Sequence, residues 1–330
     1  MLGFLVRRLG FGLLVLAGLS MASFCFFASM ADTMPSGRPV LAEYWTWLKG
    51  MGTGDSLQLL TEPAPTVLNR QPTTMLAALG HTVALLALAF VLVVAFSIAL
   101  ALVAASRRGS VLDGVLRGLS YLAWGIPAFL LALLVQKGLS SLGSSAGVGP
   151  FRLAGWPGSC PAGLGIDSGT FGSCPRAGSG LTYVASVFCY ITLPAATLAV
   201  GFVGLHARFL RSALLDTLDA PFVSVARAKG LTERQLLRRH VLRVSLGTFT
   251  SALLADFGAI FGAAMAVDWI FELNGLGTVL VNEFPIDNPS PIQTYSVQLV
   301  LLLTGSLVIV SSLLGDLALR VLDPRARSEL

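Results

Sequence analysis

Long runs of apolar residues without a charged side chain limit what this chain can fold into more than any other feature of its sequence. A helix needs about 20 apolar residues to cross the roughly 30 Å hydrocarbon core of a bilayer. Six runs approach or exceed that length, at residues 9–31, 71–106, 118–136, 177–207, 244–267 and 288–315, with Asp256 as an interruption in the fifth. They are continuously apolar, whereas the strands of a membrane barrel alternate. The sequence therefore predicts an all-α, polytopic membrane protein with six transmembrane helices.

The composition agrees with this class. Hydrophobic residues make up 55% of the chain and charged residues only 12%, whereas soluble proteins carry about 25% charged residues. A soluble enzyme and a disordered chain are both excluded on these grounds.

The distribution of basic residues predicts the orientation. Most of the 22 Lys and Arg residues lie at the N-terminus, in the tail, between the second and third runs, and between the fourth and fifth runs. Cytoplasmic segments of membrane proteins carry such an excess. Both termini are therefore expected in the cytoplasm, which requires an even number of spans. A cleaved signal peptide is the alternative for the first run, although that run is longer than the usual signal core of about 7–15 residues.

Two long segments are then expected outside the cell membrane, residues 32–76 and residues 138–182. The second contains Cys160 and Cys174. Two cysteines in one loop on the oxidising side favour a disulfide. Two free thiols are the alternative.

The sequence lacks the motifs of a P-loop ATPase and of a zinc protease. A P-loop needs a lysine followed by Ser or Thr, but Lys49, Lys137 and Lys229 are each followed by glycine. The sequence also contains no H-E-x-x-H pattern. We therefore expect no enzymatic activity in this chain, no metal or cofactor of its own, and no nucleic-acid partner.

The basic segment between the fourth and fifth runs has the pattern of a folded loop. Asp219 is predicted as an N-cap and is followed closely by Pro221, a combination typical of a helix start. Lys229 and Gly230 are predicted to end this helix. Its apolar face is predicted to consist of Phe222, Val225 and Ala226.

A second helix is predicted to begin at Thr232 and Glu233. Its apolar side is predicted to consist of Leu236, Leu237, His240 and Val241. A short amphipathic helix, a glycine turn and a second helix form a compact docking element. The alternative is a basic loop that only follows the positive-inside rule, which explains the charge but not the apolar pattern.

Residues 226–231 (A-R-A-K-G-L), followed by H-V-L-R at 240–243, resemble the cytoplasmic loop of ABC importer permeases of the dipeptide/oligopeptide/nickel family. The general importer pattern in this loop is E-A-A-x3-G-x9-I-x-L-P. Ala226, Gly230 and Leu242 match it. The chain departs from it, in the manner of the peptide-type variant, at Ser224, Val225, His240 and Arg243.

Further stretches carry the same resemblance over most of the chain. They are G-I-P-A-F at 125–129, L-P-A at 193–195, G-A-I-F-G at 258–262, V-D-W-I-F at 267–271, N-G-L-G at 274–277 and L-D-P-R-A-R at 322–327. The resemblance is weakest at residues 32–70 and 138–180.

The resemblance implies the ABC type I importer permease fold, in a bacterial plasma (inner) membrane. Residues 1–76 would form an N-terminal transmembrane helix with an external loop. Residues 77–330 would form the permease core, with five transmembrane helices, the external loop 138–182 and a cytoplasmic coupling loop at 207–247. Such a chain forms half of a pathway for peptides or a similar small solute, with nickel chelates and glutathione as alternatives.

The resemblance also implies the partners. A homologous second permease completes the pathway, two ABC ATPase subunits or domains bind ATP and Mg²⁺, and an extracytoplasmic substrate-binding protein delivers the solute. The coupling helix would run from about Asp219 to Lys229. We expect Phe222 and Val225 to anchor it in the ATPase, with Arg227 and Lys229 at the rim of that contact and Gly230 in a left-handed turn.

Asp256 is a candidate site because a charge inside the membrane is costly. It is expected either to contact the partner permease or to line the pathway. The rival function is a proton-coupled secondary transporter that uses Asp256, Asp268 and Asp316 as a relay. In the importer interpretation Asp268 instead lies near the outer end of its span, where hydration is cheap.

Overall fold

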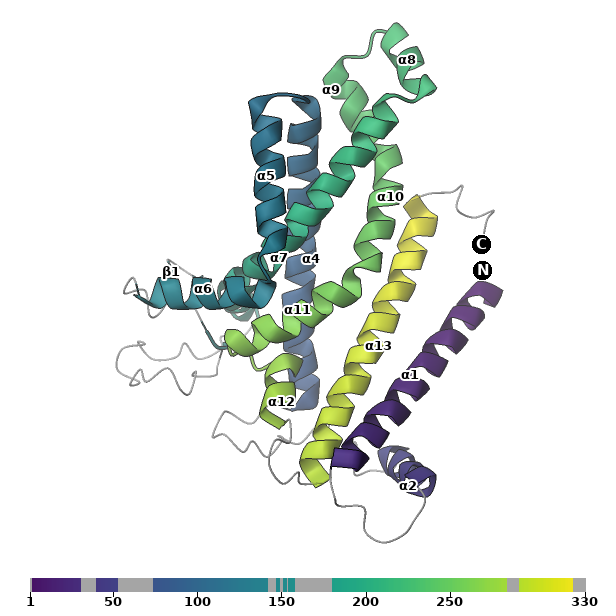
Figure 1. The fold of residues 1–330 in the computed structure, drawn as a ribbon, viewed down its shortest axis with the longest axis vertical. Coiled ribbons are helices and arrows are strands. Elements are labelled where there is room, and N and C mark those ends of the chain that lie inside the picture. Colours follow the sequence, from purple (N-terminus) through teal and green to yellow (C-terminus); the bar gives the residue numbers. More distant parts are fainter. Residues whose placement is uncertain are drawn as a thin grey trace. The chain divides into compact units, whose positions relative to one another are not determined.

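The computed structural model describes residues 2–30, 40–52, 74–141, 147–148, 151–152, 154–157, 180–283 and 291–322. Four helices are long and apolar enough to cross a membrane alone (Figure 1): α1 (Leu2–Met30), α4 (Met75–Ser106), α7 (Leu181–Leu218) and α13 (Pro291–Leu322). Two bent helix pairs raise the number to six if each pair is one span. These segments coincide with the six predicted runs, and the all-α membrane fold is confirmed.

The third predicted span is not one continuous helix. Its residues form α5 (Val111–Gly125) and α6 (Ala128–Ser141), which meet at an angle of 93°. The cause is Pro127, because the residue before a proline is pushed out of the helical region. Ile126 accordingly has φ −92° and ψ 117°. The segment predicted as a span at 118–136 is therefore bent at Pro127.

The fifth predicted span is also bent. Its residues belong to α10 (Leu242–Ala255) and α11 (Phe257–Ile270), and the bend between the two helical segments is 50°. Asp256 lies at the break, so the polar interruption noted in the sequence is the point where the helix changes direction.

The remaining elements are short. They are α2 (Val40–Gly52), the antiparallel strands β1 (Gly147–Val148) and β2 (Phe151–Arg152), α8 (Pro221–Ala228), α9 (Glu233–Leu236), the π-helical segment η1 (Leu237–Val241) and α12 (Leu276–Glu283). Helix α2 and the two strands lie in segments predicted as external loops. In Figure 1, α8 and α9 lie beyond the ends of α7 and α10.

The chain divides into two compact units, which we describe separately. Unit 1 comprises Met1–Ala84, Ala146–Tyr190 and Asp268–Val310, and unit 2 comprises Leu85–Ser145, Ile191–Val267 and Ser311–Leu330. In unit 1, α1 and α13 approach closely at glycines, since a Cβ atom at Gly12 would lie 2.8 Å from Ile309 and one at Gly305 would lie 3.0 Å from Leu16. Small residues at such crossings allow the close packing on which membrane helices depend.

In unit 2, α7 crosses α5 at another glycine. A Cβ atom at Gly204 would lie 2.6 Å from the carbonyl oxygen of Ser120, and one at Gly201 would lie 3.4 Å from the carbonyl oxygen of Ala123. The rings of Trp124 and Phe202 meet edge to face beside this crossing, with their centroids 5.7 Å apart.

We predict that Gly204→Ala destabilises the protein by about 1–3 kcal/mol, because the added methyl group meets a backbone carbonyl that cannot rotate away. Gly201→Ala is the matched control on the same helix, where the contact is ordinary. Thermal unfolding of the purified protein in nanodiscs compares the two variants. Equal midpoints would show that the crossing relaxes freely.

Candidate functional site

Helix α8 begins at Pro221, and Ala220 rather than Asp219 is its N-cap. Ala220 offers no side-chain hydrogen bond to the helix. Proline suits the first helical position because it has no N–H to satisfy and its φ is already helical. Proline therefore sets the start of the helix, the prediction of Asp219 as the N-cap is wrong, and Asp219 lies exposed just before the helix.

The two sides of α8 differ in exposure. Val223 is fully buried and Ala226 is buried beside it, whereas Phe222 is 43% exposed and Val225 57% exposed. The predicted shared face of Phe222, Val225 and Ala226 is thus wrong for Ala226. This alanine lies between Phe222 and Val223 around the helix, and it is buried with Val223. The exposed apolar residues of α8 are Phe222 and Val225.

A glycine turn ends α8. Gly230 has φ +83°, and its N–H donates to the carbonyl of Arg227 at 2.9 Å. Lys229, the exposed C-cap, precedes it. The left-handed conformation predicted for Gly230 is confirmed. Only glycine adopts this conformation without a steric cost from Cβ.

The second helix starts with a capping box. The Thr232 hydroxyl accepts the N–H of Gln235, and the Gln235 side chain accepts the N–H of Thr232. Leu236, Leu237 and Val241 are buried as predicted, but His240 is exposed. The prediction for His240 assumed an α-helical period, whereas Leu237–Val241 is π-helical and has a wider turn.

An ion pair joins the two helices of the loop across the glycine turn. Arg227 Nε lies 2.7 Å from Glu233 Oε1, and Arg227 Nη2 lies 3.2 Å from Glu233 Oε2. This hydrogen-bonded carboxylate raises the pKa of the Arg227 guanidinium. Arg227, expected at the rim of a partner contact, thus also sets the angle between α8 and α9. From the sequence, Glu233 was predicted only to lie at the start of the second helix.

The ends of the loop are tied together where they enter the membrane helices. The Ser245 hydroxyl on α10 lies 3.1 Å from the carbonyl oxygen of Ala213 and 3.0 Å from the Thr217 hydroxyl, both on α7, and 3.0 Å from the carbonyl oxygen of Val241. The loop therefore projects from a closed base formed by α7 and α10.

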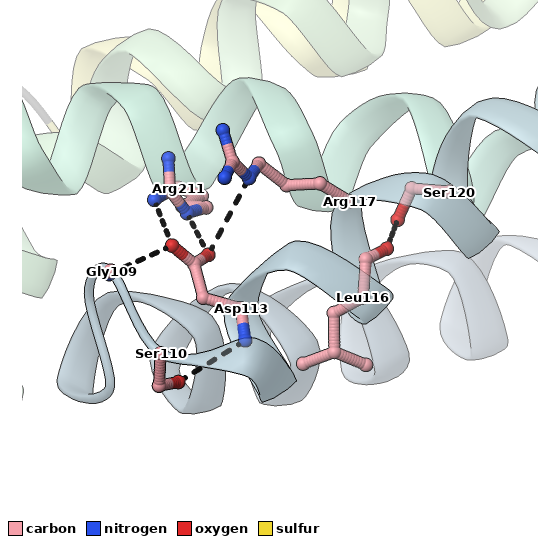
Figure 2. Close-up of polar contacts among 7 residues, drawn as sticks. All are labelled: Gly109, Ser110, Asp113, Leu116, Arg117, Ser120 and Arg211. Atoms are coloured by element: carbon pink, nitrogen blue, oxygen red, sulfur yellow. Dashed lines mark hydrogen bonds and ion pairs between the residues drawn. The ribbon is translucent and has the colours of Figure 1, made fainter.

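A buried carboxylate ties α5 to the same end of α7. Asp113 is 1% exposed, and its two oxygens accept Arg211 Nε at 2.7 Å and Arg211 Nη2 at 2.6 Å. The N–H of Gly109 also donates to it, and Arg117 lies 3.9 Å away. Figure 2 shows these groups converging on the Asp113 carboxylate, while Ser110 caps the helix. This pair was not predicted from the sequence.

Within unit 2, Asp256 faces a buried histidine. Asp256 Oδ2 lies 3.5 Å from His206 Nε2, and the two side chains are 40% and 1% exposed. Asp256 was predicted to line the pathway or to contact a partner permease. His206 was not singled out in the sequence, because a single histidine in an apolar run gives no distinct pattern.

Asp268, in unit 1, has a structural role in a tight turn. It is 1% exposed, and its oxygens accept the N–H groups of Gly275 at 3.0 Å and Thr278 at 2.9 Å. Thr82 accepts the intervening N–H of Leu276 at 2.8 Å. The expectation that Asp268 is hydrated is therefore wrong. These bonds hold the start of α12, which explains why a carboxylate is buried here.

Cys160 and Cys174, the two cysteines of the predicted disulfide, lie outside the described residues. Cys25 and Cys189, which the structure does describe, are unpaired.

Comparisons with known proteins identify the class of this fold. Residues 97–328 match the family of binding-protein-dependent transport system inner membrane components. A peptide permease protein of Brucella suis biovar 1 (strain 1330) is 28% identical over 293 residues, which is 88% of this chain and 81% of that protein. The oligopeptide transport system permease protein OppB of Mycobacterium tuberculosis (strain ATCC 25618 / H37Rv) is 28% identical over 291 residues, again 88% and 81%.

A solved structure supports the fold. It shows inward-facing conformations of the MetNI methionine ABC transporter, with a TM-score of 0.54, 16% identity, and coverage of 76% of this chain and 96% of that one. The fold and loop thus define a membrane-spanning permease subunit of an ABC importer, not a proton-coupled secondary transporter. The chain belongs to the family of binding-protein-dependent transport system inner membrane components.

We predict that Asp113→Asn or Arg211→Gln lowers the free energy of unfolding by about 3 kcal/mol, because each leaves one partner of a buried ion pair unpaired. Arg117→Gln is the matched control. Arg117 is 52% exposed and 3.9 Å from the carboxylate, so its loss should cost less than about 1 kcal/mol.

Thermal unfolding of the single variants and of the double variant Asp113→Asn/Arg211→Gln forms a double-mutant cycle. Additive losses would mean that the two side chains do not act as a pair.

Proposed function

We propose that α8 is the coupling helix through which an ATPase subunit moves this permease. The observation that carries the proposal is the exposure of Phe222 and Val225 on a helix whose adjacent side, at Val223 and Ala226, is buried. A small apolar surface with a charged surround is typical of a docking contact. Exposed Arg227, Lys229 and Asp219 surround it.

The contacts that hold the loop would let α8 act as a lever on the membrane helices. Arg227 and Glu233 fix α8 to α9, and Ser245 fixes the base of the loop to α7. A displacement of α8 is then transmitted to α7 and α10 instead of being absorbed within the loop. Closure of the ATPases on ATP would pull α8 and turn the spans from inward-open to outward-open.

The proposed assembly contains four kinds of component. They are this chain, a homologous second permease, two ABC ATPase subunits or domains that bind ATP and Mg²⁺, and an extracytoplasmic substrate-binding protein. The description of the family as binding-protein-dependent supports the last of these. ATP hydrolysis belongs to the ATPases, and this chain supplies the path and the lever.

Peptides are the proposed cargo. The Brucella suis relative is named a peptide permease and the Mycobacterium tuberculosis relative an oligopeptide permease. Nickel chelates and glutathione are the alternatives from the sequence resemblance. Binding assays with the partner substrate-binding protein distinguish these cargoes directly.

The proposed orientation places α8 and both termini in the cytoplasm of a bacterium, with the chain in its inner membrane. The pair formed by Asp113 and Arg211 brings the basic turn at 107–109 to the end of α7 that leads into the basic loop. Two basic segments thus gather at one end of unit 2, as the positive-inside rule requires. The loop with Cys160 and Cys174 then lies outside, where a disulfide between them is favoured.

We predict that a membrane-impermeant maleimide added to intact spheroplasts labels Cys160 and Cys174 only after a reductant, because the disulfide blocks both thiols. The measurement uses a Cys25→Ser/Cys189→Ser background, which removes the other two cysteines. Labelling without reductant would disprove the disulfide. Labelling that requires permeabilisation as well as reductant would reverse the orientation.

We predict that Phe222→Ala weakens docking of the ATPase by about 30-fold, equivalent to the roughly 2 kcal/mol of an interface hot spot. Substrate-stimulated ATP hydrolysis by the reconstituted complex should fall in parallel. Titration of the permease pair with purified ATPase measures the affinity. Phe209→Ala is the matched control, because Phe209 is similarly exposed (40%) but lies on α7.

The turn at Gly230 gives an independent check on the same lever. Gly230→Val should lose substrate-stimulated ATP hydrolysis in the reconstituted complex, while Gly230→Asn should retain it, because asparagine tolerates the left-handed conformation. Full stimulation in Phe222→Ala and Gly230→Val together would show that this loop is not the coupling element.

A further inference from the structure

His206 and Asp256 meet inside unit 2, where α7 passes the break between α10 and α11. His206 Nε2 and Asp256 Oδ2 are 3.5 Å apart. The His206 side chain is buried, with the ring of Phe249 edge-on at 6.1 Å between centroids. Asp256 is 40% exposed, so one side of its carboxylate is accessible and the other faces the imidazole.

The hydrogen bond of the other ring nitrogen fixes the tautomer. His206 Nδ1 lies 2.9 Å from the carbonyl oxygen of Phe202. A carbonyl can only accept a hydrogen bond, so the proton of this bond is on Nδ1. In a neutral imidazole, Nε2 then carries a lone pair and no proton.

This tautomer leaves two acceptors facing one another. A carboxylate offers only lone pairs, and Nε2 offers another. Among the described residues, Nε2 has no hydrogen-bond partner. A bridging water would need about 2.8 Å on each side, which 3.5 Å between the two atoms does not leave room for on a line between them. The arrangement lacks a donor, and a single proton is the donor that fits.

We infer that His206 and Asp256 together bind one proton, held between Nε2 and the Asp256 carboxylate. The proton makes the pair electrically neutral, and without it a net negative charge lies among the membrane helices, where unpaired charge is costly. The exposed side of Asp256 gives the proton a route to solvent.

The described surroundings of His206 and Asp256 assign the binding of the proton to these two residues. Of the groups described around His206, the charged one facing it is Asp256, while the carbonyl of Phe202 and the ring of Phe249 are its other neighbours. Arg208, two positions further along α7, is directed elsewhere. Its Nε donates to the carbonyl of Gly204 at 3.2 Å, and its guanidinium lies 3.9 Å over the ring of Tyr121.

The bound proton has a consequence for transport, which rests on the proposed coupling function. With the proton in place, α7 is attracted to the break at Asp256, and without it a carboxylate and a lone pair repel. Because the spans must move past one another during transport, protonation biases one arrangement of α7 and the bent pair over the other.

Nitrogen NMR of the assembled complex in nanodiscs, with ¹⁵N-labelled histidine, tests for the proton directly. The chain has three histidines, so His206→Gln assigns the signal of His206. His81 is the matched control, because its Nδ1 also lies 3.1 Å from a carbonyl, that of Asn274, but its ring stacks on Trp156 instead of facing a carboxylate. Labelling only this chain keeps the spectrum simple.

The expected result at neutral pH is that both nitrogens of His206 are protonated, or that infrared difference spectra against Asp256→Asn show a carboxylic acid at Asp256. Either result places the proton in the pair. An unprotonated Nε2 together with an ionised Asp256, across the pH range in which the complex stays assembled, would overturn the inference. Neither readout depends on transport, so this failure is distinct from a failure of the proposed function.

Transport into proteoliposomes over the same pH range tests the consequence. The wild type should show a pH-dependent step that His206→Gln and Asp256→Asn each abolish, and the double variant should behave like either single one. His81→Gln should keep the step. Identical pH profiles in the wild type and both single variants would show that the pair does not influence transport.

Discussion

In the hydrocarbon core of a bilayer a backbone N–H or carbonyl finds no water, so every segment that crosses it must satisfy its own hydrogen bonds. This constraint makes the chain helical, and it gives each interruption of a helix a meaning. At Pro127, α5 ends and the carbonyl of Pro127 then accepts the N–H of Leu131 at 3.1 Å as α6 begins. At Asp256 the backbone stays bonded on both sides, to Ala252 and from Ile260. The first break therefore turns the chain sharply, whereas the second bends a helix that remains continuous in its hydrogen bonds.

The same scarcity of water makes buried polar groups act in pairs. Asp113 is fully supplied with donors from Arg211 and Gly109, so it forms a rigid connection between α5 and α7. Asp268 is supplied by backbone N–H groups, and it shapes a turn. Asp256 differs from both, because the nitrogen facing it also lacks a proton in the neutral tautomer. Two of these carboxylates have their hydrogen bonds supplied by the fold, and the third is the one for which we infer a shared proton.

The sequence predicted the class of fold, the loop and its glycine turn because each depends on local patterns. Apolar length identifies a span, and a glycine that follows a short amphipathic pattern, as Gly230 does, indicates a helix end. What the sequence could not give depends on contacts between distant positions. Asp113 and Arg211 are 98 positions apart. The sequence around either residue contains no pattern that indicates the other as its partner. The exposure of His240 was missed because the π-helical segment has a different period from the α-helix assumed for it. A proline at the third span gave a usable signal for the 93° bend, because an Ile-Pro step rarely continues a helix.

Helix α8 has both a buried and an exposed apolar side, and the buried side explains how so short a helix is held in place. A helix of eight residues is too short to be stable alone. Val223 and Ala226 supply the stability by packing against the rest of the loop, and the Arg227–Glu233 pair fixes its direction. Because Val223 and Ala226 are buried in this way, Phe222 and Val225 can be largely exposed and still be held in a defined position. In the proposed coupling role, force applied to those two side chains would reach α7 through the base of the loop, where Ser245 contacts Ala213.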